Sequence, residues 1–149
     1  MLSNQDFKDL FAEFNAHSVE YLVIGAHALA AHGHVRATKD LDVWVKADRK
    51  NAVRLVEALA AFGAPMQAVA ADDFASPGIT FQIGVDPVRI DIITAVDGLT
   101  FDTAWPNRVR SDYDGEAVWV ISREDLIRNK RASGRPQDIA DIAALERLR

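Results

Sequence analysis

Cysteine is absent from the 149-residue sequence. Its absence excludes disulfide bonds, zinc sites built from thiolates and cysteine nucleophiles, and it fits a reducing compartment. Long apolar runs are absent too, since none approaches the ~20 residues that a membrane-spanning helix needs. The first six residues lack the basic-then-apolar order of a signal peptide. We therefore expect a cytoplasmic protein that has no membrane as a partner.

Basic residues are fewer than acidic ones. The sequence has 17 lysines and arginines against 22 aspartates and glutamates, which gives a net charge of −5. A chain that binds nucleic acid by bulk electrostatics needs the opposite balance, although the C-terminal third holds a local basic patch. The sequence has no internal repeat, low-complexity tract or domain linker. Its length suits one domain with a substantial core, and we expect a single domain over residues 1–149.

Apolar periodicity predicts helices mixed with short strands. The expected helices cover residues 3–16, 26–33, about 49–62, 123–132 and 136–148. The expected strands cover residues 20–25, 40–46, 79–85, 88–94 and 117–121. Less regular stretches are read as a candidate strand at 66–70, a loop at 72–78, a short helix at 101–105 and an extended piece at 108–111.

This mixture predicts an α/β (α+β) fold, in which helices pack on a small mixed β-sheet. The hairpin at 79–94, joined by Asp-Pro, argues against a purely parallel sheet. Helices over about 122–148 are expected to pack on the same domain. The faces expected to be buried comprise Val53, Leu55, Val56, Leu59 and Ala60 in the third helix and Ile139, Ile142, Ala143 and Leu145 in the last.

Two carboxylates one residue apart interrupt an otherwise apolar strand. Asp40 and Asp42 stand in the run Asp-Leu-Asp-Val-Trp-Val, and side chains at i and i+2 of a strand point to the same face. Adjacent like charges repel unless a cation lies between them. The pair therefore predicts a divalent cation, Mg²⁺ or Mn²⁺, which takes carboxylate oxygens and keeps positions for water and phosphate. The alternative is a strand-end pair satisfied by backbone N–H groups or by Lys39 and Arg36.

A small-residue turn and a third acid complete the candidate site. Gly25-Ala26 follows an apolar strand and opens a helix, so backbone N–H groups there could meet a triphosphate. Asp91 is the only acid in a strand of valine and isoleucine, on a face shared with Arg89. Three carboxylates on partner strands can hold one or two Mg²⁺ ions for phosphoryl transfer. For Asp91 the alternative is an ion pair with a neighbour such as Arg89 or Lys39.

These residues resemble the sequence pattern of a known superfamily. The order of apolar strand, Gly plus small residue, short helix, Thr-x-Asp-Leu-Asp at 38–42 and a later strand with an acid resembles the nucleotidyltransferase superfamily related to polymerase β. The runs from Ile24 to Asp42 and from Leu126 to Asp141 are similar to the branch that includes abortive-infection nucleotidyltransferase toxins and many uncharacterised bacterial proteins. One position departs from the pattern, because the superfamily usually has Gly-Gly or Gly-Ser where this chain has Gly25-Ala26 and lacks the serine hydroxyl.

The resemblance implies roles for the acids. Asp40 and Asp42 would bind both metal ions, and Asp91 would complete the second metal site and act as general base for the acceptor hydroxyl. The substrate would be an NTP, whose NMP is moved to an acceptor that is RNA, protein or a small molecule. The nucleotidyltransferase-like fold would be shared as well.

Several cations are candidates for the phosphates. Lys130 and Arg135 could offset phosphate charge, or they could belong to a solvated patch at a helix end, where cations are favoured in any case. Arg36 and Thr38 flank the acid pair and could touch phosphate, although turn chemistry explains them as well. His27 is expected near the nucleotide pocket.

Three functions remain open at this stage. The first is an Mg²⁺-dependent nucleotidyltransferase that releases pyrophosphate. The second is a nucleotide-binding, weakly active or inactive component of a toxin–antitoxin pair that acts through a co-encoded protein partner. Ala26 and the small size of the chain motivate this second hypothesis. The third, metal-dependent hydrolysis of a phosphoester, would use the same acids.

Overall fold

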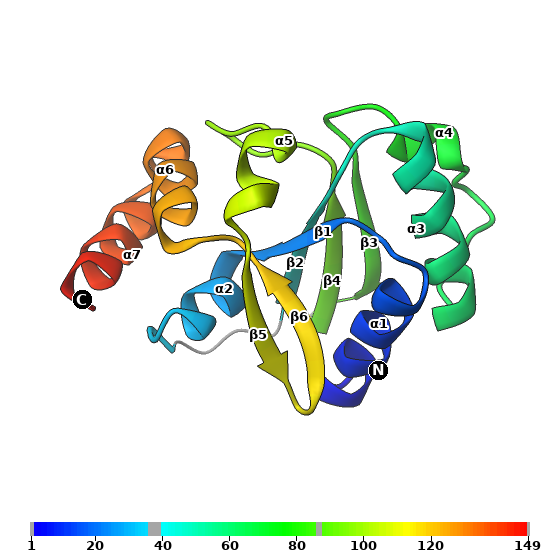
Figure 1. The fold of residues 1–149 in the computed structure, drawn as a ribbon, viewed down its shortest axis with the longest axis horizontal. Helices are drawn as coiled ribbons and strands as arrows, with labels where there is room; N and C mark the ends of the chain where they lie inside the picture. The colour runs from blue at the N-terminus through cyan, green and yellow to red at the C-terminus, as the bar shows by residue number, and fades with distance from the viewer. Residues whose placement is uncertain (1, 36–39, 86–87, 149) are drawn as a thin grey trace.

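The computed structural model describes residues 2–35, 40–85 and 88–148 (Figure 1). Its centre is a six-stranded sheet with the order β3-β4-β2-β1-β6-β5. The strands are β1 (Tyr21–Ile24), β2 (Asp40–Val45), β3 (Thr80–Val85), β4 (Val88–Ile93), β5 (Val109–Tyr113) and β6 (Glu116–Val120). The pairs β2–β4 and β1–β6 are parallel and the other three are antiparallel, which confirms the predicted mixed sheet.

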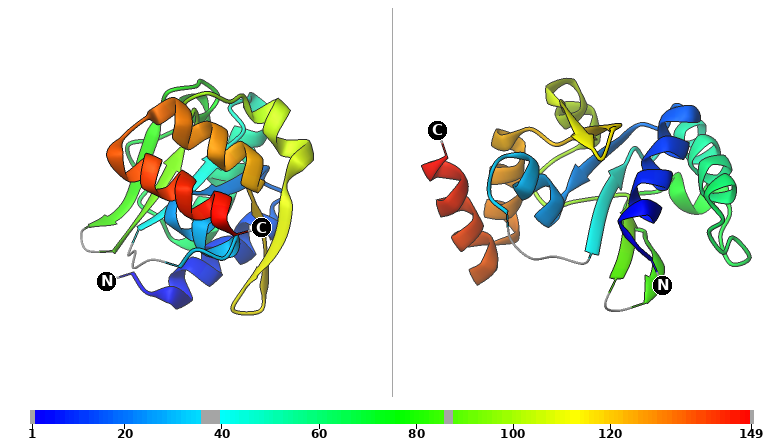
Figure 2. Two further views of the ribbon diagram at one scale, coloured as in Figure 1. Left: turned by 90° about the vertical axis from the view of Figure 1, so that its left-hand side faces the viewer. Right: turned by 90° about the horizontal axis from the view of Figure 1, so that it is seen from below.

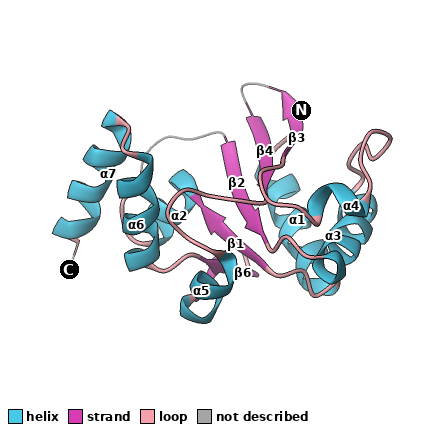
Figure 3. Ribbon diagram, turned by 90° about the horizontal axis from the view of Figure 1, so that it is seen from above, coloured by secondary structure: helices cyan, strands magenta, loops and turns pink. Residues whose placement is uncertain are grey.

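Helices lie on both sides of this sheet (Figures 2 and 3). On one side are α1 (Asn4–Ala16), α2 (Gly25–Ala31), α3 (Arg49–Phe62) and the short α4 (Ala71–Phe74), with α1 and α2 in contact through Phe7 and His27. On the other side is α6 (Arg123–Ser133), against which α7 (Pro136–Arg147) packs. The chain between β4 and β5 forms α5 (Phe101–Ala104) and the 3₁₀ turn η1 (Trp105–Asn107). In the part of the chain that the structure describes, no helix combines the length and the apolarity that crossing a bilayer requires.

The N-terminal helix shows why these segments fold as they do. Phe7, Leu10, Phe11 and Phe14 repeat at three- to four-residue spacing and are all buried. Asp6 accepts a hydrogen bond from the backbone N–H of Ser3 at 2.7 Å, which is the return bond of a capping box at the start of this helix. The apolar stripe packs α1 against the sheet, where it contacts the interior strand β6, and against α3.

Two predicted buried faces are partly wrong. In α3, Leu55 and Leu59 are buried as expected, but Val53 is 36% exposed and Ala60 is exposed. The other buried residues of this helix are Asn51, Ala52 and Ala58. Asn51 is bound into the fold because its amide donates to the carbonyls of Glu20 and Lys46, both at 3.0 Å. A polar residue therefore occupies the position that periodicity assigns to an apolar one.

The last helix departs from the prediction in the same way. Leu145 is buried and Ile142 is partly buried, but Ile139 is 62% exposed and Ala143 is exposed. The inward face of α7 carries two carboxylates, Asp138 and Asp141, each 1% exposed. The helix is rotated to bury these acids because they have a cationic partner inside the protein, described below.

The stretch between α3 and β3 also differs from expectation. Residues 66–70 form a turn rather than a strand, and α4 replaces the beginning of the predicted loop. Asp73 accepts a hydrogen bond from the backbone N–H of Ala70 at 2.8 Å, and Phe74 is fully buried. A local cap and one apolar anchor thus stabilise a single helical turn.

Candidate active site

The three predicted acids meet at neighbouring strands of the sheet. In the parallel pair β2–β4, Asp42 lies directly opposite Asp91, and Asp40 lies opposite Arg89. Because side chains two residues apart share a face of a strand, Asp40, Asp42 and Asp91 project to the same side. The structure therefore assembles the acid cluster that the spacing predicts.

Gly25 lies directly against this cluster. It begins α2, just after β1, whose last residue pairs with Asp42. Its φ is +69°, and a Cβ atom at this position would lie 2.4 Å from Oδ2 of Asp42. Only glycine fits here, because any side chain would need both a left-handed backbone and the space of the carboxylate. Ala26, the next residue, is buried and contributes backbone rather than a hydroxyl.

Arg89 belongs to the cluster as an ion-pair partner of two of its acids. Its guanidinium makes two hydrogen bonds to Asp91, from Nε at 2.9 Å and from Nη2 at 3.2 Å. Nη2 also lies 3.6 Å from Oδ2 of Asp40. The arginine therefore bridges the two strands between the first and third acids, as the alternative interpretation of Asp91 anticipated.

The electrostatics of the cluster are dominated by crowded negative charge. Burial raises the pKa of Asp42 to about 6, and repulsion from Asp91 and Asp40 adds to the shift, while Arg89 offsets part of it. A carboxyl group with a raised pKa among other acids gains from an added cation. The donor set is oxygen only, which is the set that Mg²⁺ and Mn²⁺ prefer.

A cavity of about 480 Å³ opens over the acids. The sheet side of its lining includes Gly25, Asp40, Asp42, Arg89 and Asp91. The opposite wall includes Asp97, Asn129, Lys130, Ser133 and Arg135. The cavity volume lies within the range of small-molecule sites, about 300–1,000 Å³. One concave site thus combines carboxylates on one side with cations and amide or hydroxyl groups on the other.

The identity of the fold follows from comparison with known proteins. A family model described as "Nucleotidyltransferase of unknown function (DUF6036)" matches residues 5–147. The chain belongs to this nucleotidyltransferase family. A search of curated proteins finds no match.

Solved structures of nucleotidyltransferases share the fold. The lincomycin-bound lincosamide antibiotic adenylyltransferase LnuA is 14% identical with a TM-score of 0.61, and the match covers 99% of both chains. ANT(2'')-Ia in complex with adenylyl-2''-tobramycin is 16% identical with a TM-score of 0.60, covering 98% of this chain and 95% of that one. An antigenic nucleotidyltransferase-like protein from Paracoccidioides brasiliensis is 18% identical with a TM-score of 0.58, covering 97% and 75%. At these identities the likeness establishes the fold.

The predicted phosphate ligands of the nucleotidyltransferase fall into three groups. Gly25 lines the cavity beside the acids, and Lys130 and Arg135 line its far wall. Arg36 and Thr38 lie outside the described residues. His27, expected near the nucleotide, instead lines a separate cavity of about 380 Å³ and stacks edge-on against Phe7 at 5.6 Å.

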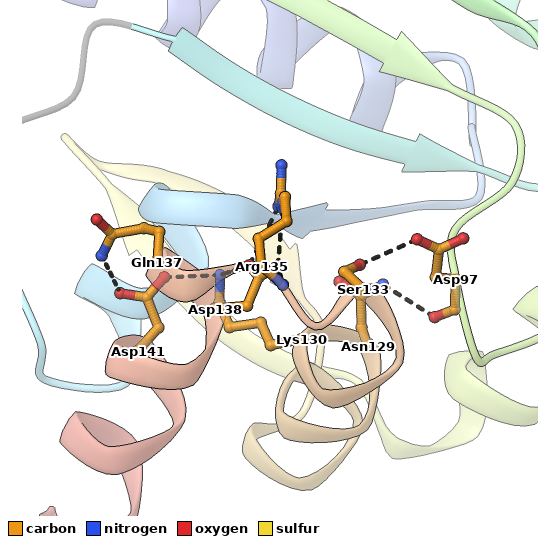
Figure 4. Close-up of polar contacts among 8 residues, drawn as sticks. All are labelled: Asp97, Asn129, Lys130, Ser133, Arg135, Gln137, Asp138 and Asp141. Atoms are coloured by element: carbon orange, nitrogen blue, oxygen red, sulfur yellow. Dashed lines mark hydrogen bonds and ion pairs between the residues drawn. The ribbon is translucent and has the colours of Figure 1, made fainter.

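Lys130 is held in a buried ion-pair network at the junction of α6 and α7 (Figure 4). Its Nζ lies 2.9 Å from Oδ2 of Asp141 and 3.6 Å from Oδ1 of Asp138, and its side chain is only 6% exposed. Arg135 binds Asp138 through Nε at 2.7 Å and Nη2 at 3.1 Å, but its own side chain is 74% exposed. Lys130 is therefore buried rather than part of a solvated patch, and Arg135 is the more accessible cation.

Three residues of the far wall were not among the predicted site residues: Asp97, Asn129 and Ser133. Asn129 donates to the backbone carbonyl of Asp97 at 3.0 Å, and Ser133 donates to Oδ2 of Asp97 at 3.0 Å. Gly98 brings this loop so close to α6 that a Cβ would lie 2.6 Å from Cβ of Ala132. The loop after β4 is thus fastened to α6, so the two walls of the cavity are fixed relative to each other. No sequence motif marks these residues, since their contacts depend on the tertiary fold.

The residues fit a divalent cation in chemistry. Within residues 2–35, 40–85 and 88–148, no three acidic or imidazole side chains are grouped closely enough to hold an ion as they stand. Arg89 supplies the positive charge between Asp40 and Asp91 instead. Asp40, Asp42 and Asp91 are the residues that would hold a metal ion in this nucleotidyltransferase.

Proposed function

We propose that this nucleotidyltransferase moves the NMP group of an NTP to a hydroxyl of a small-molecule acceptor, with Mg²⁺ or Mn²⁺, and releases pyrophosphate. The observation that carries the proposal is the convergence of Asp40, Asp42 and Asp91 beside Gly25 in one cavity. Phosphoryl transfer needs positioning and charge neutralisation more than covalent chemistry. This cavity offers both, because three carboxylates lie on its floor and the exposed guanidinium of Arg135 lies in its far wall.

The residues of the cavity have separate roles in the proposed reaction. The acceptor oxygen forms a bond to the α-phosphorus while the bond to the bridging oxygen of the β-phosphate breaks, and pyrophosphate leaves. Asp91 accepts the proton of the acceptor hydroxyl. Asp40, Asp42 and Asp91 would hold the metal ion, whose charge stabilises the attacking and leaving oxygens when it is bound. Arg135 lies at the far wall with its side chain 74% exposed, so its guanidinium can reach the phosphates from its ion pair with Asp138.

Two observations favour a small-molecule acceptor over RNA. The chain carries a net charge of −5, whereas binding a polyanion calls for a surplus of cations. Two proteins of the same fold are described with small molecules, LnuA with lincomycin and ANT(2'')-Ia with adenylyl-2''-tobramycin. A protein acceptor and a co-encoded protein partner are outcomes that the test below also detects.

The test is transfer of label from α-³²P-labelled NTPs in Mg²⁺ to a panel of hydroxyl-bearing small molecules, total RNA and purified proteins. Wild type is compared with Asp42→Asn and with a matched control, Asp102→Asn, which alters an acid that is 77% exposed and lies outside the cavity. We expect transfer by wild type and the control, and a loss of about 100-fold or more in Asp42→Asn. Equal labelling by Asp42→Asn and wild type would rule out the catalytic assignment.

The second candidate function is nucleotide binding with little turnover, as one component of a toxin–antitoxin pair. Ala26 favours it, because the residue beside Gly25 supplies no hydroxyl to phosphate. Calorimetry with NTP and Mg²⁺ separates the two. Binding without transfer to any acceptor supports the second function, and transfer supports the first.

A further inference from the structure

The acid cluster contains its own cation. Arg89 and Asp91 are two residues apart on β4, and Arg89 lies opposite Asp40 on β2. The guanidinium can therefore reach both strands from one face of the sheet. Both carboxylate oxygens of Asp91 accept hydrogen bonds from it, at 2.9 and 3.2 Å. Such two-pronged contacts between arginine and a carboxylate are strong and fix the orientation of both groups.

This arrangement conflicts with metal binding at the same oxygens. A divalent cation held by Asp40 and Asp91 would stand close to the guanidinium, which lies 3.6 Å from Asp40 and 2.9 Å from Asp91. Two cations sharing the same carboxylates repel each other. The arginine must therefore move before the ion can use both oxygens of Asp91.

The cavity offers the guanidinium another partner. Arg89 lines the cavity and its side chain is 27% exposed, so it is not locked in the core. A guanidinium binds phosphate oxygens as readily as a carboxylate, often with two parallel hydrogen bonds. A triphosphate in this cavity would present such oxygens within reach of a long, flexible side chain.

We propose that Arg89 is the counter-ion of the acid cluster in the nucleotide-free protein, and that an incoming triphosphate takes over its guanidinium, so that the divalent cation binds tightly only together with the nucleotide. This inference rests on the proposed function, since it concerns the same site. It assigns Arg89 as a positioning residue that couples two ligands. By linkage, the metal strengthens nucleotide binding by the same factor as the nucleotide strengthens metal binding.

The first test uses the wild-type protein. The Kd of Mn²⁺ is measured by calorimetry and by electron paramagnetic resonance, without nucleotide and with the α,β-methylene analogues of the four ribonucleoside triphosphates. We expect at least one analogue to tighten Mn²⁺ binding about tenfold or more, within the usual range of coupling between sites. Equal Mn²⁺ affinity with and without every analogue would overturn the inference.

The second test removes the guanidinium. Arg89→Met keeps most of the side-chain volume without the charge, Arg89→Lys keeps the charge without the two-pronged geometry, and Arg110→Met alters an exposed arginine of β5 outside the cavity. Without nucleotide, we expect Arg89→Met to bind Mn²⁺ about tenfold more tightly than wild type does. Without metal, we expect the same variant to bind the nucleotide analogue more weakly than wild type does. Arg89→Lys should lie in between, and Arg110→Met should match wild type.

A purely structural arginine would give a different pattern. It would leave the nucleotide-free Mn²⁺ affinity of Arg89→Lys and Arg89→Met unchanged, even if their melting temperatures fell, and this result would overturn the inference. The outcome is separable from that of the proposed function. Coupled binding of Mn²⁺ and nucleotide without any label transfer would reject the transferase proposal while supporting the role of Arg89. Label transfer without coupled binding of Mn²⁺ and nucleotide would support the transferase proposal and reject the role of Arg89.

Discussion

Gly25 lies so close to Asp42 that a Cβ atom on the glycine would overlap Oδ2 of the carboxylate. We therefore expect Gly25→Ala to displace Asp42 as well as to strain a backbone with φ of +69°. The matched control is Gly63→Ala, where φ is +98° but nothing lies within 4 Å of the added Cβ. The control should cost about 1 kcal/mol of stability from the backbone alone. Gly25→Ala should cost more and weaken Mn²⁺–nucleotide binding by tenfold or more, measured by urea unfolding and calorimetry.

The raised pKa of Asp42 makes stability depend on pH in a defined direction. Because its pKa is about 6 in the folded protein and near 3.8 ordinarily, the folded chain holds a proton that the unfolded chain has released between these values. The free energy of unfolding therefore falls as pH rises from about 4 to about 6. Asp42→Asn removes this penalty, and we expect it to be more stable than wild type above pH 6, by on the order of 2 kcal/mol.

Below pH 4 the advantage of Asp42→Asn should vanish, since both states of wild type are then protonated. Urea unfolding in EDTA from pH 3 to 7.5 measures the difference. Asp102→Asn, which removes an exposed acid, serves as the control and should show no such profile. A difference between Asp42→Asn and wild type that is constant with pH would contradict the assigned cause.

The two cations of the far wall should respond differently to mutation. Lys130→Met leaves the carboxylates of Asp138 and Asp141 buried with less compensation, and removing one partner of a buried pair costs about 3–5 kcal/mol. Arg135→Gln removes a side chain that is 74% exposed, so we expect a cost of about 1 kcal/mol together with a weaker NTP affinity. Thermal melts and calorimetry on both variants check this. A Lys130→Met protein as stable as wild type would contradict the role of the network.

Asn51 should be a major stabilising residue of the fold. Its side chain accepts a hydrogen bond from the N–H of Glu20 at 2.8 Å and donates to two backbone carbonyls. Asn51→Ala removes the side-chain partner of the Glu20 N–H and of the Lys46 carbonyl, at about 1–3 kcal/mol for each unsatisfied group, whereas the carbonyl of Glu20 keeps the N–H of Lys46 at 3.2 Å. We expect a loss of about 3 kcal/mol in urea unfolding. Val53→Ala, at a partly exposed position on the same helix, should cost less than about 1 kcal/mol.

The acid cluster could be predicted because it depends on the simplest periodicity of protein structure. Asp40 and Asp42 share a face as soon as residues 40–45 form a strand, and Asp91 stands out as the single acid in an apolar run. Gly25 could be predicted as a tight turn because it lies between an apolar strand and a helix that are neighbours in the sequence. Most elements followed from apolar spacing and caps, as in α1 and α6.

The remaining features depend on distant parts of the chain. Arg89 bridges the acids only because β4 pairs with β2 in one particular register. Lys130 is buried because the next helix turns two carboxylates inward, and an apolar-periodicity argument assigns that face to Ile139 and Ala143 instead. Periodicity identifies apolar faces, so it fails where a buried face is polar and internally neutralised.

The parallel register of β2 and β4 has a consequence for folding errors. A slip of β4 by one residue would place Ile90 or Ile92 opposite Asp42 and would turn Arg89 and Asp91 to the opposite face of the sheet, where the apolar core lies. Such a chain would bury a carboxylate and a guanidinium in the core and expose Ile90 and Ile92, which are fully buried in the native register. The register that assembles the acid cluster is therefore the same one that completes the core, so selection for a stable fold also preserves the alignment of Asp42 with Asp91.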